Sequence, residues 1–121
     1  MYIQRAAEGE TVDRSGAPIF EGQVWGRTLT GDASDMVTAS IVSFAAGART
    51  RTHRHTSDQV LHVVSGIGQV GDAEGDHTIA VGDTVVIPAG TDHWHGAGDT
   101  GSPMSHMTIM QAGSETTVVE G

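Results

Sequence analysis

Short runs of β-branched residues recur along this chain, separated about every 8 to 12 residues by turns that contain glycine. Valine, isoleucine and threonine favour extended backbone because their branched side chains pack well on a pleated surface. The seventeen glycines supply the tight turns, for example at Gly31-Asp32, Gly71-Asp72 and Gly82-Asp83. Helical periodicity is essentially missing. The pattern therefore predicts an all-β chain, folded as a sandwich or a barrel.

The length of 121 residues fits one domain over residues 1–121, with no repeat or linker to divide it. Both ends are polar for about 20 residues, so we expect them to be loose or to add edge strands to a partner subunit, as in a homodimer. The segments predicted as strands are Gly22 to Leu29, Val37 to Phe44, Arg51 to His55, Val60 to Val64, Gly68 to Gly71, His77 to Ala80, Thr84 to Ile87, Asp92 to Gly96, Met104 to Gln111 and Thr116 to Val119.

Charge and composition exclude several classes of function. The net charge is −9, with six arginines and no lysine, which argues against a nucleic-acid partner. Without cysteine there is no disulfide, thiolate metal site or cysteine nucleophile. The chain has neither a signal-like start nor an apolar run of about 18 residues, so we expect a soluble, cytoplasmic protein without membrane contact. Arg49, Arg51 and Arg54 crowd one segment and either guide an anionic substrate or form a solvated surface, the second being favoured.

Two separated clusters of polar side chains indicate a metal site. His53 and His55 are two residues apart, so in a strand both imidazoles leave the same face. Imidazole is the commonest protein ligand for borderline divalent metals, and the amide oxygen of Gln59 adds a neutral, harder donor. With His93 from the second cluster, these residues predict a site of three histidines and one glutamine with open coordination positions.

The spacing of these residues resembles the two signatures of the cupin superfamily, over residues 47–66 and 82–97. The first reads Gly47, His53, His55, Gln59 and Gly66, and the second reads Gly82, Pro88, Ala89, Gly90 and His93. Most cupins have a glutamate where this chain has Gln59, and a closing asparagine where it has Ala97. The resemblance implies a single-domain jelly-roll barrel, also called a double-stranded β-helix, with His53, His55, Gln59 and His93 around a metal inside it.

A closer resemblance is to small bacterial manganese-dependent cupin hydroxynitrile lyases, which cleave cyanohydrins to an aldehyde or ketone and hydrogen cyanide. It is carried by Gln59, by the runs Gly47-Ala48-Arg49-Thr50 and His93-Trp94-His95-Gly96, and by His106. The resemblance implies manganese on the three histidines and Gln59, with His106 as the proposed base. The ligand set also accepts iron, nickel, cobalt or zinc.

Two further histidines are candidate catalytic residues. His95 lies two residues after His93 and shares its inward face, where it either lines the pocket as a donor or orients a ligand. His106 alternates with Thr108 and Met110, so it reaches the cavity if that face is inward, and otherwise bonds a backbone carbonyl. We expect His62 to point away from the metal and His77 to be exposed.

Three functions are consistent with such a site and a small-molecule substrate. In the first, a lyase, a neutral ligand set leaves a divalent ion close to its full charge, which lowers the pKa of a bound substrate hydroxyl. His106 then acts as general base, and His95 or His106 protonates or holds the cyanide. The second is a manganese or iron dioxygenase that cleaves a carbon–carbon double bond. The third is a non-catalytic cupin that binds a metal or a metabolite.

Overall fold

The computed structural model describes residues 1–119, and the expected single domain over 1–121 extends two residues beyond them. The described residues form strands and turns. Among them there is no helix that is long and apolar enough to cross a membrane. The all-β prediction is confirmed. The strands are β1 (Val12–Asp13), β2 (Phe20–Glu21), β3 (Val24–Thr28), β4 (Val37–Phe44), β5 (Arg49–Thr50), β6 (His53–His55), β7 (Gln59–Asp72), β8 (Gly75–Ala80), β9 (Thr84–Ile87), β10 (Trp94–Gly96), β11 (Met104–Gln111) and β12 (Thr116–Val118).

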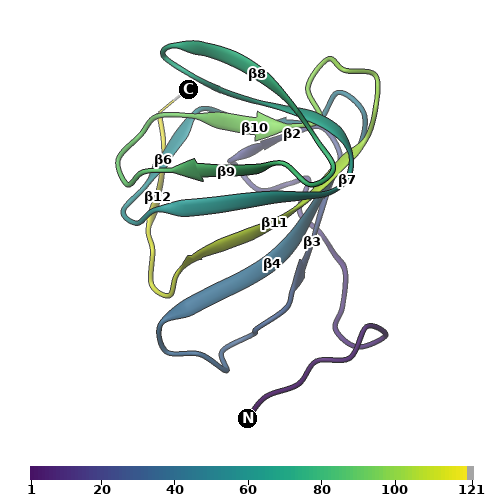
Figure 1. The fold of residues 1–121 in the computed structure, drawn as a ribbon, viewed down its shortest axis with the longest axis vertical. Coiled ribbons are helices and arrows are strands. Elements are labelled where there is room, and N and C mark those ends of the chain that lie inside the picture. Colours follow the sequence, from purple (N-terminus) through teal and green to yellow (C-terminus); the bar gives the residue numbers. More distant parts are fainter. Residues whose placement is uncertain (120–121) are drawn as a thin grey trace.

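Strand β7 joins the two halves of a curled antiparallel sheet (Figure 1). Its first half pairs with β9 and β11, and β11 continues the sheet through β4 and β3 to β1. Its second half pairs with β8 and β10, and β10 leads through β5 to β2. Strands β6 and β12 form a small separate ladder. Because one long strand belongs to both halves of the sheet, the halves can curl toward each other and enclose a core.

The expected turn at Gly66 is wrong. The predicted strands Val60 to Val64 and Gly68 to Gly71 are parts of one 14-residue strand, β7. Gly66 lies beside an irregularity where the register with β11 shifts between Ser105 and His106. Its φ is 75°, and a Cβ there would lie 1.9 Å from the carbonyl oxygen of Pro103. Glycine therefore serves a bulge that lets the strand bend from one half of the sheet to the other.

Other boundaries differ because short strands depend on their partners more than on their own residues. Of the predicted strand Arg51 to His55, only β6 (His53–His55) is extended, and a separate short strand, β5, ends just before it at Thr50. His93 lies just before β10, tied to His53 by a pair of backbone hydrogen bonds of 2.9 Å. Strands β1 and β2 were missed, and they pair with β3 and β5 of the same chain. At the other end, β12 pairs with β6.

The core lies between the facing inner surfaces of the curled sheet. Along β7 and β11 alternate residues are buried, as expected for strands that have one face on a core. The buried apolar side chains form one cluster, made of Val24, Phe44, Ala48, Leu61, Val63, Val70, Ile79, Ile87, Ala97 and Met104. Buried histidines continue this interior. They mark the candidate site, because burying a polar group costs free energy unless the group is hydrogen-bonded or binds a ligand.

Candidate metal centre

Three histidine side chains converge inside the curled sheet. His53 and His55 leave the same face of β6, and His93 reaches them from the segment that precedes β10. One ligand nitrogen from each lies within 4.8 Å of the other two. All three residues are buried, with exposures of 1%, 6% and 1% respectively. The structure therefore brings together the histidines that the sequence placed in two separate clusters.

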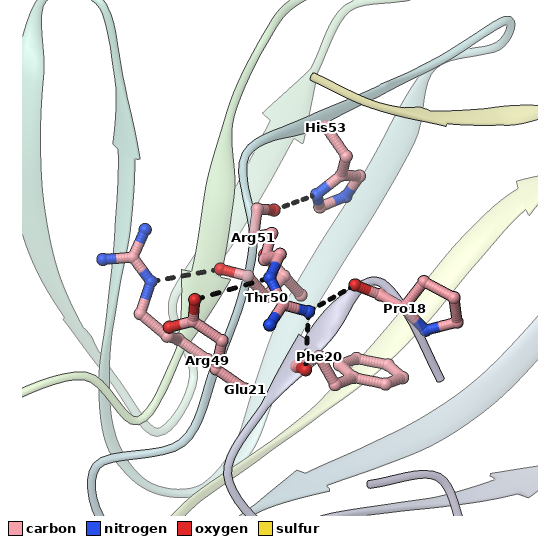
Figure 2. A network of polar contacts seen from close by, with 7 residues as sticks. All are labelled: Pro18, Phe20, Glu21, Arg49, Thr50, Arg51 and His53. Atoms are coloured by element: carbon pink, nitrogen blue, oxygen red, sulfur yellow. Dashed lines mark hydrogen bonds and ion pairs between the residues drawn. The ribbon is translucent and has the colours of Figure 1, made fainter. Parts of the chain in front are cut away.

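The outer ring nitrogen of each histidine is held by a hydrogen bond. Nδ1 of His53 lies 2.8 Å from the carbonyl oxygen of Arg51 (Figure 2), and Nδ1 of His93 lies 2.8 Å from that of Thr91. Since a carbonyl only accepts, both Nδ1 atoms carry the proton and both Nε2 atoms keep a free lone pair. Nδ1 of His55 lies 2.7 Å from Oγ1 of Thr116. These partners aim the metal-binding nitrogens inward.

The ligand atoms that point into the cluster have no hydrogen-bond donors facing them among the described residues. Oε1 of Gln59 lies 3.1 Å from Nε2 of His93, although both atoms are acceptors in this arrangement. Reversal of the amide or a shared cation would relieve this contact. Nε2 of His55 is also buried and has no hydrogen-bond partner among the described residues, which favours the cation. Two ligands about 2.1 Å from one ion and at right angles would lie roughly 3 Å apart, so the donor set fits a divalent metal.

Burial keeps the three imidazoles neutral. Desolvation lowers the pKa of His53 to about 4, and it also lowers the pKa values of His55 and His93. The hydrogen bonds to the carbonyls of Arg51 and Thr91 act in the opposite direction but are the smaller effect. At pH 7 the three rings are therefore unprotonated, which is the form that binds a metal.

A second line of buried side chains runs away from this cluster. The His95 ring stacks on His93 at 5.7 Å between centroids and lies 5.4 Å from His53. Nδ1 of His95 lies 3.0 Å from Nε2 of His106, and Nδ1 of His106 lies 3.0 Å from Oγ1 of Thr108. Nε2 of His95 is buried without a partner among the described residues. His95, rather than His106, is thus the next ring to the metal ligands.

The inward face of β11 is the one that holds His106. His106 is fully buried, with both ring nitrogens bonded to side chains and its ring 5.5 Å from that of Phe44. Burial lowers its pKa to about 4, and it lowers the pKa of His95 well below the usual value. His62 is bonded to Thr84, out of phase with Gln59 as expected, and His77 is exposed as predicted.

Sequence reasoning missed two of the side chains that support the histidines, Thr116 and Thr108. Thr116 contacts His55 from a polar C-terminal strand, and Thr108 ends the hydrogen-bonded line from His95. Phe44 packs its ring against both His95 and His106. The only signal for Thr108 was its alternation with His106 on one face of β11. No signal pointed to Thr116, because β12 meets β6 only through the fold.

The arginines near the histidines have structural partners. The Arg51 guanidinium donates hydrogen bonds to the carbonyls of Pro18 and Phe20 and lies 3.5 Å from the Glu21 carboxylate (Figure 2). It thereby ties the N-terminal segment to the strand end that carries His53. Arg54 pairs with Asp92 at 2.8 Å, and the Arg49 guanidinium lies 3.9 Å from the centre of the Trp94 ring. This cluster holds the framework and is not arranged to bind a substrate.

Comparison with known proteins agrees with this architecture. A family profile described as "Cupin domain" matches residues 40–110. A curated relative, the (R)-mandelonitrile lyase of Granulicella tundricola, is 38% identical over 77 residues. The match covers 63% of this chain and 58% of the relative, so it spans less than two thirds of that protein.

Solved structures of other bacterial proteins share the fold. A cupin-like protein from Thermotoga maritima has a TM-score of 0.82 and 26% identity, over 93% of this chain and 87% of that one. The polyketide cyclase RemF from Streptomyces resistomycificus has a TM-score of 0.84 over 98% of this chain and 85% of its own. At 15% identity that second likeness concerns the fold alone. The predicted jelly-roll fold is confirmed.

Proposed function

The chain belongs to the cupin family, and from this premise we propose that it is a metal-dependent carbon–carbon lyase that splits cyanohydrins. The observation that carries the proposal is a buried imidazole nitrogen, Nε2 of His95, which lies beside a cluster of neutral metal donors and has no hydrogen-bond partner among residues 1–119. The partial match to a mandelonitrile lyase supplies the substrate class. Its products would be a carbonyl compound and hydrogen cyanide.

His53, His55, His93 and Gln59 would hold one divalent ion. The bound ion would supply Lewis-acid chemistry, lowering the pKa of a substrate hydroxyl placed next to it. Because all four donors are neutral, little of the ion's charge is offset by its ligands. The donors accept several metals, and we propose manganese from the resemblance to cupin hydroxynitrile lyases.

His95 would transfer the proton. Its free Nε2 accepts the proton of the substrate hydroxyl, the carbonyl forms, and the bond to the nitrile carbon breaks with its electron pair on cyanide. The same nitrogen then returns the proton to cyanide, so the reaction balances as one carbonyl compound and one HCN. The lowered pKa of His95 keeps it unprotonated at mildly acidic pH, where uncatalysed breakdown of cyanohydrins is slow.

His106 would position His95. For Nε2 of His95 to be an acceptor, Nδ1 of His95 must carry the proton and donate it to Nε2 of His106. Nδ1 of His106 then donates to Oγ1 of Thr108. This order of donors fixes one tautomer at each ring and stabilises the charge that His95 gains during the reaction. The roles thus differ from the expectation that His106 itself takes the proton.

Mandelonitrile cleavage tests the lyase proposal. Manganese-loaded protein at mildly acidic pH is expected to release benzaldehyde well above background, measured by absorbance, whereas chelator-treated protein should fall to background. Oxygen uptake, measured in the same reaction, should not accompany turnover. Equal rates for loaded and stripped protein would rule the proposal out, and oxygen uptake linked to turnover would favour the dioxygenase alternative.

We also propose that the chain forms a homodimer through the outer face of the sheet. There Ala39, Ile109, Val60 and Val86 lie opposite one another in register across β4, β11, β7 and β9. Val86 is 63% exposed although it continues this apolar row. A second copy of the face would cover such a patch.

Light scattering after size exclusion tests the dimer. The wild type is expected at twice the chain mass of 12.5 kDa. Val86→Glu places a charge in the apolar row and should shift the protein toward one chain mass on dilution. Val81→Glu is the matched control, because Val81 is also 63% exposed but lies after β8, outside the row. A wild type of one chain mass at every concentration would contradict the proposal.

A further inference from the structure

A cavity of about 380 Å³ opens against β3 and β4, on the side of the sheet that ends with β1. Its wall includes Val42 and Phe20, which also pack against the apolar core. The volume is in the range of pockets for small ligands. The described residues that line it include two arginines, Arg14 and Arg27, and no acidic residue. In a chain of net charge −9, this cavity is a local site of positive charge.

The Arg14 side chain lies over the inner surface of β3. Gly26 pairs with Val42, so both positions belong to the surface that faces the cavity. A Cβ built on Gly26 would meet Cγ and Nε of Arg14 at 3.3 Å. The missing side chain at Gly26 thus makes room for the arginine, and the guanidinium is held at the wall of the cavity.

The Arg14 side chain differs from that of Arg27, because it has no hydrogen-bond or ion-pair partner among the described residues. Arg27 donates hydrogen bonds to the backbone carbonyls of Glu8 and Ala6. The carboxylate of Asp13, next to Arg14 in sequence, accepts hydrogen bonds from Ser15 and Gln23. Among the described residues, no ion pair or side-chain hydrogen bond involves Arg14. Its five N–H donors are therefore available to a ligand.

The cavity adjoins the line of histidines. In the register of the sheet, Val42 lies opposite His106, and Ser40 lies opposite Thr108. Gly26, Val42 and His106 form a row across three strands, so Gly26 and His106 are separated by two strand spacings, roughly 10 Å. A ligand about as long as one aromatic ring with a group at each end matches this separation.

We propose that this cavity binds the carboxylate of an anionic substrate on Arg14, with the opposite end of the molecule directed toward His106 and His95. The inference rests on the proposed function in treating the bound anion as a lyase substrate. The substrate class is then a carboxylated aromatic or similarly sized cyanohydrin, and its aldehyde is the product. The hydroxyls of Thr38 and Ser40 on the cavity wall add polar partners.

Binding of a matched pair of aldehydes tests the inference without turnover. 4-Formylbenzoate carries the charge, and methyl 4-formylbenzoate has nearly the same shape without it. The chain has no lysine, so no side-chain amine can react with either aldehyde. Calorimetric titration of the metal-loaded protein is expected to give a dissociation constant about five- to tenfold lower for the acid, since a partly exposed charged hydrogen bond contributes on that scale.

Two arginine variants separate a specific contact from a general effect of charge. Arg14→Gln should remove the preference for the acid, and Arg14→Lys should restore part of it. Arg5→Gln changes the net charge equally outside the cavity and should leave the preference intact. The inference is overturned if acid and ester bind alike, if neither binds, or if Arg5→Gln acts like Arg14→Gln. A preference for the acid in a protein that cleaves no cyanohydrin would retain the anion site and reject the lyase function.

Discussion

Replacing His53 by alanine is expected to abolish metal binding. Nε2 of His53 is one of the three buried nitrogens that lie within 4.8 Å of one another, and Arg51 fixes its orientation through Nδ1. Loss of a side chain that supports a metal ligand typically lowers metal affinity 10- to 100-fold, so loss of a ligand itself should exceed about 100-fold. The metal content measured by elemental analysis after dialysis should fall from about one ion per chain in the wild type to nearly none in the variant. Lyase turnover should be lost with the metal.

A control with the same chemical change distinguishes the ligand from a general effect on the fold. His62→Ala also removes an imidazole, but His62 is out of phase with Gln59 and is bonded to Thr84. Added manganese at 100 times its dissociation constant should stabilise the wild type and His62→Ala against unfolding by about 2.7 kcal/mol. His53→Ala should show no such gain in thermal unfolding. If His53→Ala still bound one metal ion per chain, His53 would not be a metal ligand.

The parts of the fold that depend on spacing along the chain could be predicted from sequence. The alternation of β-branched residues and glycine turns predicted the all-β class, and residues 47–97 carry the cupin signatures. Strands β4, β9 and β11 agree with their predicted bounds. Their runs of β-branched and other apolar residues are either long or end at turn residues, so the local sequence specifies them. The spacing of His53 and His55 placed both on one face of a strand. Because periodicity relates residues within one strand and not between strands, their convergence with His93 was predicted from the donor chemistry of the two clusters and from the family resemblance.

The rest depends on contacts between distant segments. Gly66 was expected to be a turn because isolated glycine permits one, but the carbonyl of Pro103 occupies the space of its Cβ within a continuous strand. The Thr116 contact with His55 joins residues 61 positions apart. Arg14, which follows β1, reaches the cavity because Gly26 in β3 has no side chain. In each case the residue types alone permit several arrangements, and packing selects one of them.

Replacing His95 by alanine is expected to lower kcat by about 10²- to 10⁴-fold, the contribution of a positioned proton-transfer group. Metal content should remain near one ion per chain, because His95 is not among the proposed ligands. Since alanine leaves space at a residue that is only 4% exposed, His95→Gln provides a second variant of similar volume. Circular dichroism should show that both variants keep the strand content of the wild type.

His106 should respond differently if it acts through His95. Its Nε2 contacts Nδ1 of His95, so His106→Ala leaves a buried nitrogen without its partner, which costs about 1–3 kcal/mol and corresponds to roughly 10- to 100-fold in kcat. KM should change little, since both ring nitrogens of His106 are bonded to His95 and Thr108 and neither is left for the substrate. His106→Gln, which keeps a hydrogen-bonding group near Nδ1 of His95, should recover part of the rate. If instead His106→Ala abolishes turnover while His95→Ala retains it, the proton passes to His106, as the resemblance to the lyases implies.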